Sequence, residues 1–222
     1  MSDETRDKVG RRTTITIARQ MGCGGAYVGR AIARRLGLGY VDREVLHLAA
    51  QSLNVEDAAV EASSEKLTSF WERLLGGLTR LPPESPYTPP PVRTFTDEEL
   101  FRRQVEALKL IAAREDCVIV GYGGAFVLPR HEGAVNLYFH APLKFRVKRV
   151  MEIYNLSGAH EAGRMIEESD EMRGRYFARM TDVDWTCANN YHLCIDTSIY
   201  SLPELAERLI RFVEHKVGVR GE

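Results

Sequence analysis

Short apolar runs alternate along the chain with longer stretches in which apolar residues recur every three or four positions. The short runs are rich in β-branched residues and have the length of buried strands. They lie at residues 13–18, 40–42, 117–121, 135–139 and 192–196. Helical periodicity is seen at residues 28–36, 43–51, 67–75, 96–111, 142–153, 159–180 and 201–213. Strands that alternate with helices in this way predict an α/β fold with a five-stranded parallel sheet.

Two segments do not follow this alternation. Residues 1–12 are polar and predict a disordered or trimmed tail. Residues 52–95 combine an amphipathic helix with the sequence LPPESPYTPPPV, which holds six of the nine prolines. Because proline fixes φ and lacks a backbone donor, this part of the insert is predicted to be an extended surface loop. Long loops inside compact domains are typically lids, binding loops or disordered segments.

Composition narrows the classes of protein to consider. The 222 residues are enough for one sizeable core. The 30 Lys and Arg against 31 Asp and Glu give a net charge of −1, so neither nucleic acid nor a membrane surface is an expected partner. No apolar run approaches the roughly 18–20 residues of a membrane span. The four cysteines show no CxxC pair or zinc spacing, so we expect reduced thiols in a cytoplasmic protein without a metal site.

A glycine-rich turn, residues 22–25, joins the first predicted strand to the first helix. In such a unit, backbone N–H groups and the positive end of the helix dipole point at a bound phosphate. The full motif is G-x-x-x-x-G-K-[ST]. In this chain Arg19 stands at the first glycine and Gly25 at the lysine. The turn therefore has the shape of a phosphate loop without its lysine, and a plain tight turn is the alternative.

Six sequence blocks follow one another between residues 13 and 200, on either side of the insert at 52–95. They are ITIARQMGCGGAYVGRAIARRLGLGYVDRE, CVIVGYGGAFVL, FRVKRV, ESDEMRGRYFARMT, DVDW and YHLCIDTS. In this order they resemble the cytidylate kinase-like family. The resemblance implies a P-loop kinase-type three-layer α/β/α fold in a single domain at residues 13–218. It also implies that residues 143–181 form a helical lid and that residues 52–95 are an insert on the acceptor side.

The resemblance also implies that the turn binds ATP with Mg²⁺. The residues that would wrap the β- and γ-phosphates are Gly22, Cys23, Gly24, Gly25 and Ala26. In this family the lysine position is commonly glycine and an arginine precedes it, so Arg19 could supply the missing cation. A guanidinium is permanently charged and can hold phosphate with two hydrogen bonds. Tyr27 stands where related kinases carry the magnesium-binding threonine, so no protein ligand for the metal is predicted.

Three further residues are predicted to take part in catalysis. Asp42 follows the second strand and, by resemblance, would orient the acceptor phosphate or a magnesium-bound water; it could equally cap the helix predicted from residue 43. Arg146 and Arg149 are three positions apart and therefore share a helix face. In the kinases, lid arginines of this kind stabilise the charge of the transferring phosphoryl group. Solvated surface arginines are the alternative.

The predicted acceptor side departs from true cytidylate kinases. They carry Gly-Arg-Asp after the third strand, whereas this chain has Tyr122 between two glycines. A tyrosine can stack on a base but cannot neutralise a phosphate. By resemblance, Asp170, Arg173 and Arg175 on the long helix would bind the acceptor, although arginines there could instead pair with nearby glutamates. Trp185 either covers the adenine or closes the core.

The function implied by the resemblance is phosphoryl transfer from ATP to a nucleoside monophosphate, most directly CMP or dCMP. Two alternatives remain. The missing lysine and acceptor-site charges would also suit a weak or inactive nucleotide-binding sensor or regulatory protein. The proline-rich insert would also suit a kinase for a different small phosphate acceptor. In each case the partners are small-molecule nucleotides, and the oligomeric state is open.

Overall fold

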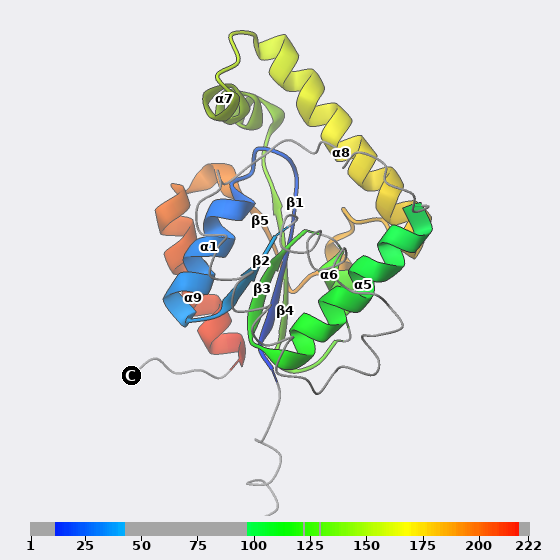
Figure 1. The fold of residues 1–222 in the computed structure, drawn as a ribbon. Coiled ribbons are helices and arrows are strands. Elements are labelled where there is room, and N and C mark those ends of the chain that lie inside the picture. The colour runs from blue at the N-terminus through cyan, green and yellow to red at the C-terminus, as the bar shows by residue number, and fades with distance from the viewer. Residues whose placement is uncertain (1–11, 43–96, 122, 129, 218–222) are drawn as a thin grey trace, which may run out of the picture.

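The computed structural model describes residues 12–42, 97–121, 123–128 and 130–217 (Figure 1). The strands are β1 (Thr14–Arg19), β2 (Gly39–Val41), β3 (Cys117–Val120), β4 (Ala134–His140) and β5 (Leu193–Asp196). The α-helices are α1 (Gly25–Leu36), α5 (Asp97–Arg114), α6 (Gly124–Val127), α7 (Leu143–Tyr154), α8 (Ala159–Thr181) and α9 (Leu202–Val217). Two short 3₁₀ turns, Ala188–Asn190 and Thr197–Ile199, flank β5.

The five strands form one parallel sheet in the order β2-β3-β1-β4-β5. The central strand is β1, in which Ile17 lies opposite Val120 of β3 and Leu137 of β4. All carboxyl ends therefore meet at the same edge, where open parallel sheets bind their ligands. The glycine turn follows directly after β1 at that edge.

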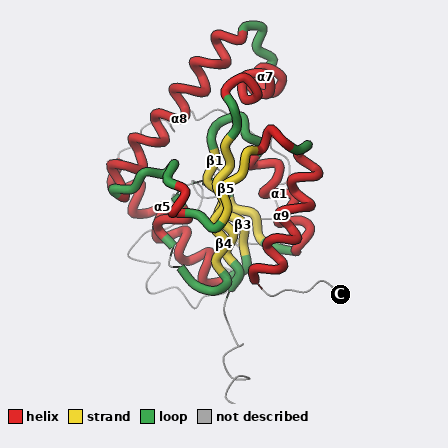
Figure 2. The backbone as a smooth tube through the Cα atoms, turned by 180° about the vertical axis from the view of Figure 1, so that it is seen from behind, coloured by secondary structure: helices red, strands yellow, loops and turns green. Residues whose placement is uncertain are grey.

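Both faces of the sheet are covered by helices. Because successive residues of a strand point to opposite faces, Ile15 and Ile17 of β1 pack in one core with Ile32 of α1 and Leu209 of α9. Figures 1 and 2 show α1 and α9 on this face and α5 on the other, and Figure 1 shows α6 beside α5. The α/β fold with a five-stranded parallel sheet is therefore confirmed, and the helices make it a three-layer structure.

Helices α7 and α8 extend beyond the carboxyl ends of the strands (Figure 1). Val150 of α7 is buried against Ala162 and Ile166 of α8, which joins the two helices as a pair. Helix α7 follows β4 at the carboxyl edge of the sheet, and α8 runs from the outer end of the pair back towards the sheet (Figure 1). The pair is therefore connected to the edge that carries the glycine turn. It occupies the residues predicted to form a lid.

The predicted strand ends agree more closely with the structure than the helix ends do, since α1 begins before the predicted residue 28, α9 continues past the predicted residue 213, and the short α6 was not predicted. Each of the five predicted strands matches an observed strand to within one residue at either end. Gly37, with a φ of 67°, closes α1, and Ser201 with Glu204 forms a capping box at the start of α9. The predicted helices at 43–51 and 67–75, the proline-rich loop and the tail before residue 12 lie outside the described residues.

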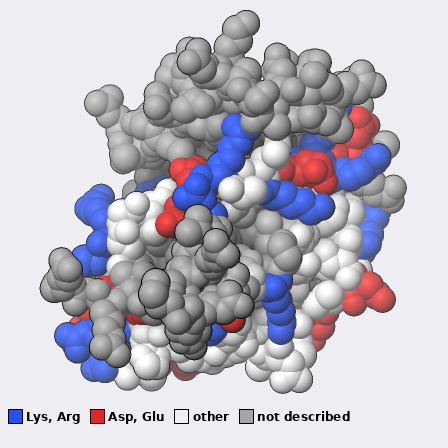
Figure 3. Space-filling view, turned by 90° about the horizontal axis from the view of Figure 1, so that it is seen from below, with Lys and Arg blue, Asp and Glu red and all other residues white. Residues whose placement is uncertain are grey.

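The charged surface agrees with the low net charge of the chain. Figure 3 shows basic and acidic side chains interspersed on the face seen from below. No single-sign patch dominates the described part of that face. None of the helices within the described ranges is long and apolar enough to cross a membrane.

His192, which precedes β5, is expected to make stability depend on pH. Its Nδ1 accepts a 2.8 Å hydrogen bond from the backbone N–H of Asn136, and burial, with Lys216 and Arg130, lowers the pKa of His192 from 6.5. The unfolded chain therefore binds more protons as the pH falls through 6.5, and stability is lost. We expect the free energy of unfolding, measured in urea, to fall between about pH 7 and 5, and to fall less in His192→Gln. Equal pH dependence in both proteins would contradict this.

Candidate functional site

The glycine turn leaves the start of α1 open. Gly22 and Gly24 have φ values of 82° and 78°, which side chains rarely tolerate. Gly24 is the N-cap residue of α1 and provides no side-chain cap. The first N–H groups of a helix have no intrahelical partner, so this end of α1 has the form of an anion-binding site.

Two helices pack closely on this turn. A Cβ atom at Gly22 would lie 3.1 Å from the carbonyl oxygen of Arg146 and 3.1 Å from Val150 Cγ2, both on α7. A Cβ atom at Gly24 would lie 2.5 Å from Leu202 Cδ2 at the start of α9. Both positions therefore require glycine for space as well as for φ, and the contacts with α7 and α9 fix the conformation of the turn.

Arg19, the last residue of β1, extends across the beginning of α1. A Cβ atom at Gly25 would lie 3.0 Å from Arg19 Cγ, and a Cβ atom at Gly121 would lie 2.5 Å from Arg19 Nη1. The guanidinium therefore lies between the turn and the end of β3. Within the described ranges no carboxylate forms an ion pair with it. Its charge is thus available to an anionic ligand.

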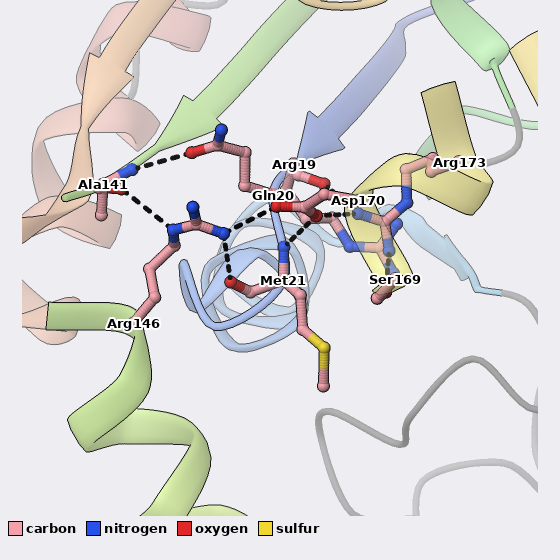
Figure 4. Close-up of polar contacts among 8 residues, drawn as sticks. All are labelled: Arg19, Gln20, Met21, Ala141, Arg146, Ser169, Asp170 and Arg173. Atoms are coloured by element: carbon pink, nitrogen blue, oxygen red, sulfur yellow. Dashed lines mark hydrogen bonds and ion pairs between the residues drawn. The ribbon is translucent and has the colours of Figure 1, made fainter. Parts of the chain in front are cut away.

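Asp170 of α8 connects the lid helices to the turn (Figure 4). Its Oδ1 accepts hydrogen bonds from the backbone N–H of Met21 and from Arg173 Nη1, both at 2.9 Å. Its Oδ2 accepts one from Arg146 Nη1 at 2.7 Å. One carboxylate therefore holds α7, α8 and the turn together.

Arg146 and Arg173 also donate to backbone carbonyls. Arg146 Nε donates to Ala141 at 3.0 Å and its Nη1 to Met21 at 3.3 Å, while Arg173 Nη1 donates to Arg19 at 2.9 Å. Burial, and then the positive charge of Arg19, lowers the pKa of Arg173 to about 10. Arg173 therefore stays charged at neutral pH. We name Arg19, Arg146, Asp170 and Arg173 the arginine cluster; its three guanidinium groups and one carboxylate leave it positive.

A small cavity lies beside Arg19 and Arg173. Its volume is about 10 Å³, room for one water-sized molecule but not for a nucleobase. Phe177 and Trp185 help to line it. Trp185 is 5% exposed and packs against Tyr138 with 5.7 Å between ring centroids. Of the two interpretations of Trp185, the structure therefore shows the one in which it closes the core.

A family model described as the cytidylate kinase-like family matches residues 14–199. This range holds the whole sheet, the turn and the lid helices. The chain belongs to the cytidylate kinase-like family. Its membership supports a kinase-type phosphotransferase that uses a nucleotide, as expected from the sequence. No curated protein matches the chain.

Among the solved structures that match this cytidylate kinase-like protein, two show how far the likeness extends. An uncharacterized protein from Eubacterium ventriosum ATCC 27560 is 20% identical with a TM-score of 0.68, over 92% of this chain and 99% of that chain. A gluconokinase from Sinorhizobium meliloti 1021 is 12% identical with a TM-score of 0.52, over 94% and 95%. At these identities the likeness concerns the fold alone.

The structure does not bring every predicted site residue of the cytidylate kinase-like protein to the cluster. Arg175 is 74% exposed and pairs with Glu171 on the outer side of α8. Asp42 pairs with Arg30, with 3.4 Å between Oδ2 and Nη2, and Arg149 is half-buried on α7. Tyr122 lies outside the described residues. The assigned roles of these residues, like those of the turn, remain predictions.

Two contributors to the site were not found from the sequence. In the sequence Gly121 only precedes the missing Arg-Asp pair, yet in the structure a Cβ atom there would lie 2.5 Å from Arg19 Nη1, and its φ is 97°. A glycine directly after a buried strand is a sequence signal for such a close approach. Met21 contributes only its backbone, and no side-chain motif could reveal that.

Proposed function

We propose that this protein transfers the γ-phosphoryl group of ATP to a nucleoside monophosphate, with CMP or dCMP as the expected acceptor. The observation that carries the proposal is the Arg19 guanidinium, which lies across the glycine turn and has no carboxylate partner among the described residues. A triphosphate held at the start of α1 would bring its anionic oxygens to this cation.

Phosphoryl transfer depends on positioning and on charge stabilisation, and little covalent chemistry is asked of the protein. The N–H groups of the turn would hold the β- and γ-phosphates. Arg19 would stabilise the negative charge on the transferring group, and the buried Arg146 and Arg173 would raise the positive potential around it. Asp170 would keep both of those arginines in place.

The residues of the turn fit a phosphate but not a protein-bound metal. The uncapped start of α1 suits an anion. Tyr27, at the position of the magnesium-binding threonine, carries no suitable aliphatic hydroxyl, and no group of three or more His, Cys, Asp or Glu in the described ranges could hold a metal. Mg²⁺ would therefore arrive with ATP and be held by phosphate oxygens and water.

Two features of the sequence favour functions other than transfer to CMP or dCMP, and the assay must distinguish them. Gly25 in place of lysine would suit a sensor that binds ATP without turnover. Tyr122 in place of the Arg-Asp pair would suit another acceptor, and the gluconokinase among the structural neighbours makes D-gluconate a reasonable one to include.

We expect ADP release when the protein is mixed with ATP, Mg²⁺ and CMP or dCMP, and slower release with UMP or AMP. A coupled assay measures ADP, and calorimetry measures ATP binding in parallel. ATP binding without ADP release would identify a sensor, and release with D-gluconate alone would identify another acceptor. Absence of both binding and release would overturn the nucleotide-dependent function itself.

A further inference from the structure

The stem of Arg19 occupies the space in which a side chain at position 25 would begin. A Cβ atom built on Gly25 would lie 3.0, 3.1 and 3.2 Å from Arg19 Cγ, Cδ and Cβ. Three contacts at these distances are tighter than ordinary van der Waals packing. A residue larger than glycine at position 25 would therefore have to displace the stem of Arg19.

The far end of the same side chain meets a second glycine. A Cβ atom at Gly121 would lie 2.5 Å from Arg19 Nη1, and the φ of 97° independently favours glycine there. Arg19 thus passes over one glycine at the start of α1 and ends against another, which follows β3. The two glycines together define a path that fits a long, planar-ended side chain.

The charge of Arg19 is not used within the cluster. Asp170 is shared between Arg146 and Arg173 and also accepts from the backbone N–H of Met21, and no described contact joins its carboxylate to the Arg19 guanidinium. The positive charge of Arg19 contributes to the lowered pKa of Arg173, so the two guanidinium groups repel one another. An anion bound between the turn and β3 would relieve that repulsion.

We propose that Gly25 is a positioning residue: its missing side chain allows Arg19 to lie across the turn, so that Arg19 replaces the lysine usual at position 25. This inference rests on the proposed function. On this view position 25 must be glycine if Arg19 is to occupy its place. The site then has room for one cationic side chain, which can come from position 19 or from position 25. A Cβ atom at position 25 does not by itself obstruct phosphate, because the full motif carries lysine there.

The test is a double-mutant cycle on the full chain, with ATP·Mg²⁺ and inorganic tripolyphosphate as probes in calorimetry. Arg19→Ala should raise the Kd for both probes about 10- to 30-fold, the effect of a lost charge-assisted hydrogen bond. Gly25→Ala should raise it about five- to tenfold by displacing Arg19. In the Arg19→Ala background, Gly25→Ala should raise the Kd by less than about twofold more, because the side chain that it would displace is no longer present.

A second set of variants transfers the positive charge from position 19 to position 25. Gly25→Lys alone should weaken binding, since both side chains compete for one space. The double variant Arg19→Ala/Gly25→Lys should recover a Kd within about fivefold of the unchanged protein. Gly163→Ala is the matched control, because a Cβ atom there meets nothing within 4 Å, and it should leave the Kd unchanged.

The outcomes separate this inference from the proposed function. If ATP binds and Arg19→Ala weakens binding, but Gly25→Ala has the same effect with and without Arg19, Gly25 does not act through Arg19 and the inference is overturned. If neither probe binds the unchanged protein, the proposed function fails and the inference fails with it. Circular dichroism melts identify variants that do not fold, and alanine favours a helix more than glycine does, so Gly25→Ala should fold.

Discussion

Replacing Asp170 with asparagine is expected to lower the free energy of unfolding by about 3 kcal/mol, because two guanidinium groups lose their counter-charge. The side chains of Arg146, Arg173 and Asp170 are 10%, 19% and 17% exposed, so water can solvate them only in part. The asparagine amide would also present a donor where Asp170 accepts. Since the same carboxylate binds Met21, the attachment of α8 to the turn would weaken as well.

Urea unfolding followed by circular dichroism measures this effect. Glu171→Gln is the matched control: it is the adjacent residue, it removes one carboxylate, and its pair with the exposed Arg175 is worth less than about 1 kcal/mol. A similar loss in both variants would show that the contacts of Asp170 do not stabilise the fold. For a chain of this size, the expected loss corresponds to a Tm lower by about 6–12 °C.

The fold was predictable because its signals are local. The strand at 13–18 is a run of β-branched residues, and the helix at 159–180 has its apolar residues on one face, so each could be identified without knowledge of its neighbours. The order β2-β3-β1-β4-β5 is a different matter. It depends on contacts between distant segments, and the pattern along the chain predicted a parallel sheet without an order of strands.

The site was predictable only in part for the same reason. Asp170 and Arg173, three positions apart on a predicted helix, could be expected to meet. That Asp170 also binds Met21, 149 positions away, and Arg146 could not be read from spacing. Helical geometry did contain one unused signal: Arg175 follows Arg173 by two positions, about 200° around the helix, so the two cannot serve the same ligand from one face.

Arg19 differs from the other two arginines of the arginine cluster in the partners of its guanidinium group. Arg146 and Arg173 are bound to Asp170 and to backbone carbonyls, whereas the described residues offer Arg19 no carboxylate. Loss of Asp170 should therefore act on stability, while loss of the Arg19 side chain should act on chemistry. The two variants separate the part of the cluster that stabilises the fold from the cation that would face the phosphate in the proposed function.

We expect Arg19→Ala to lower kcat for ADP formation from ATP and CMP about 100-fold or more, which is the usual effect of removing one preorganised donor to a transition state. Its free energy of unfolding should change by less than about 1 kcal/mol, because no ion pair is broken. Arg19→Lys should be intermediate in kcat, since it keeps the charge but not the two-pronged contact. Steady-state kinetics and urea unfolding on the same preparations measure both quantities.

Arg34→Ala is the control for this variant, because Arg34 is an exposed arginine on α1 away from the turn. It should change neither kcat nor stability. A folded Arg19→Ala protein with unchanged kcat would mean that transfer does not use this cation, and a loss of stability equal to that of Asp170→Asn would mean that Arg19 supports the fold instead. The predicted result is a large loss of rate in a protein that unfolds as before, because no carboxylate among the described residues pairs with Arg19 and, in the proposed function, its charge would face the phosphate.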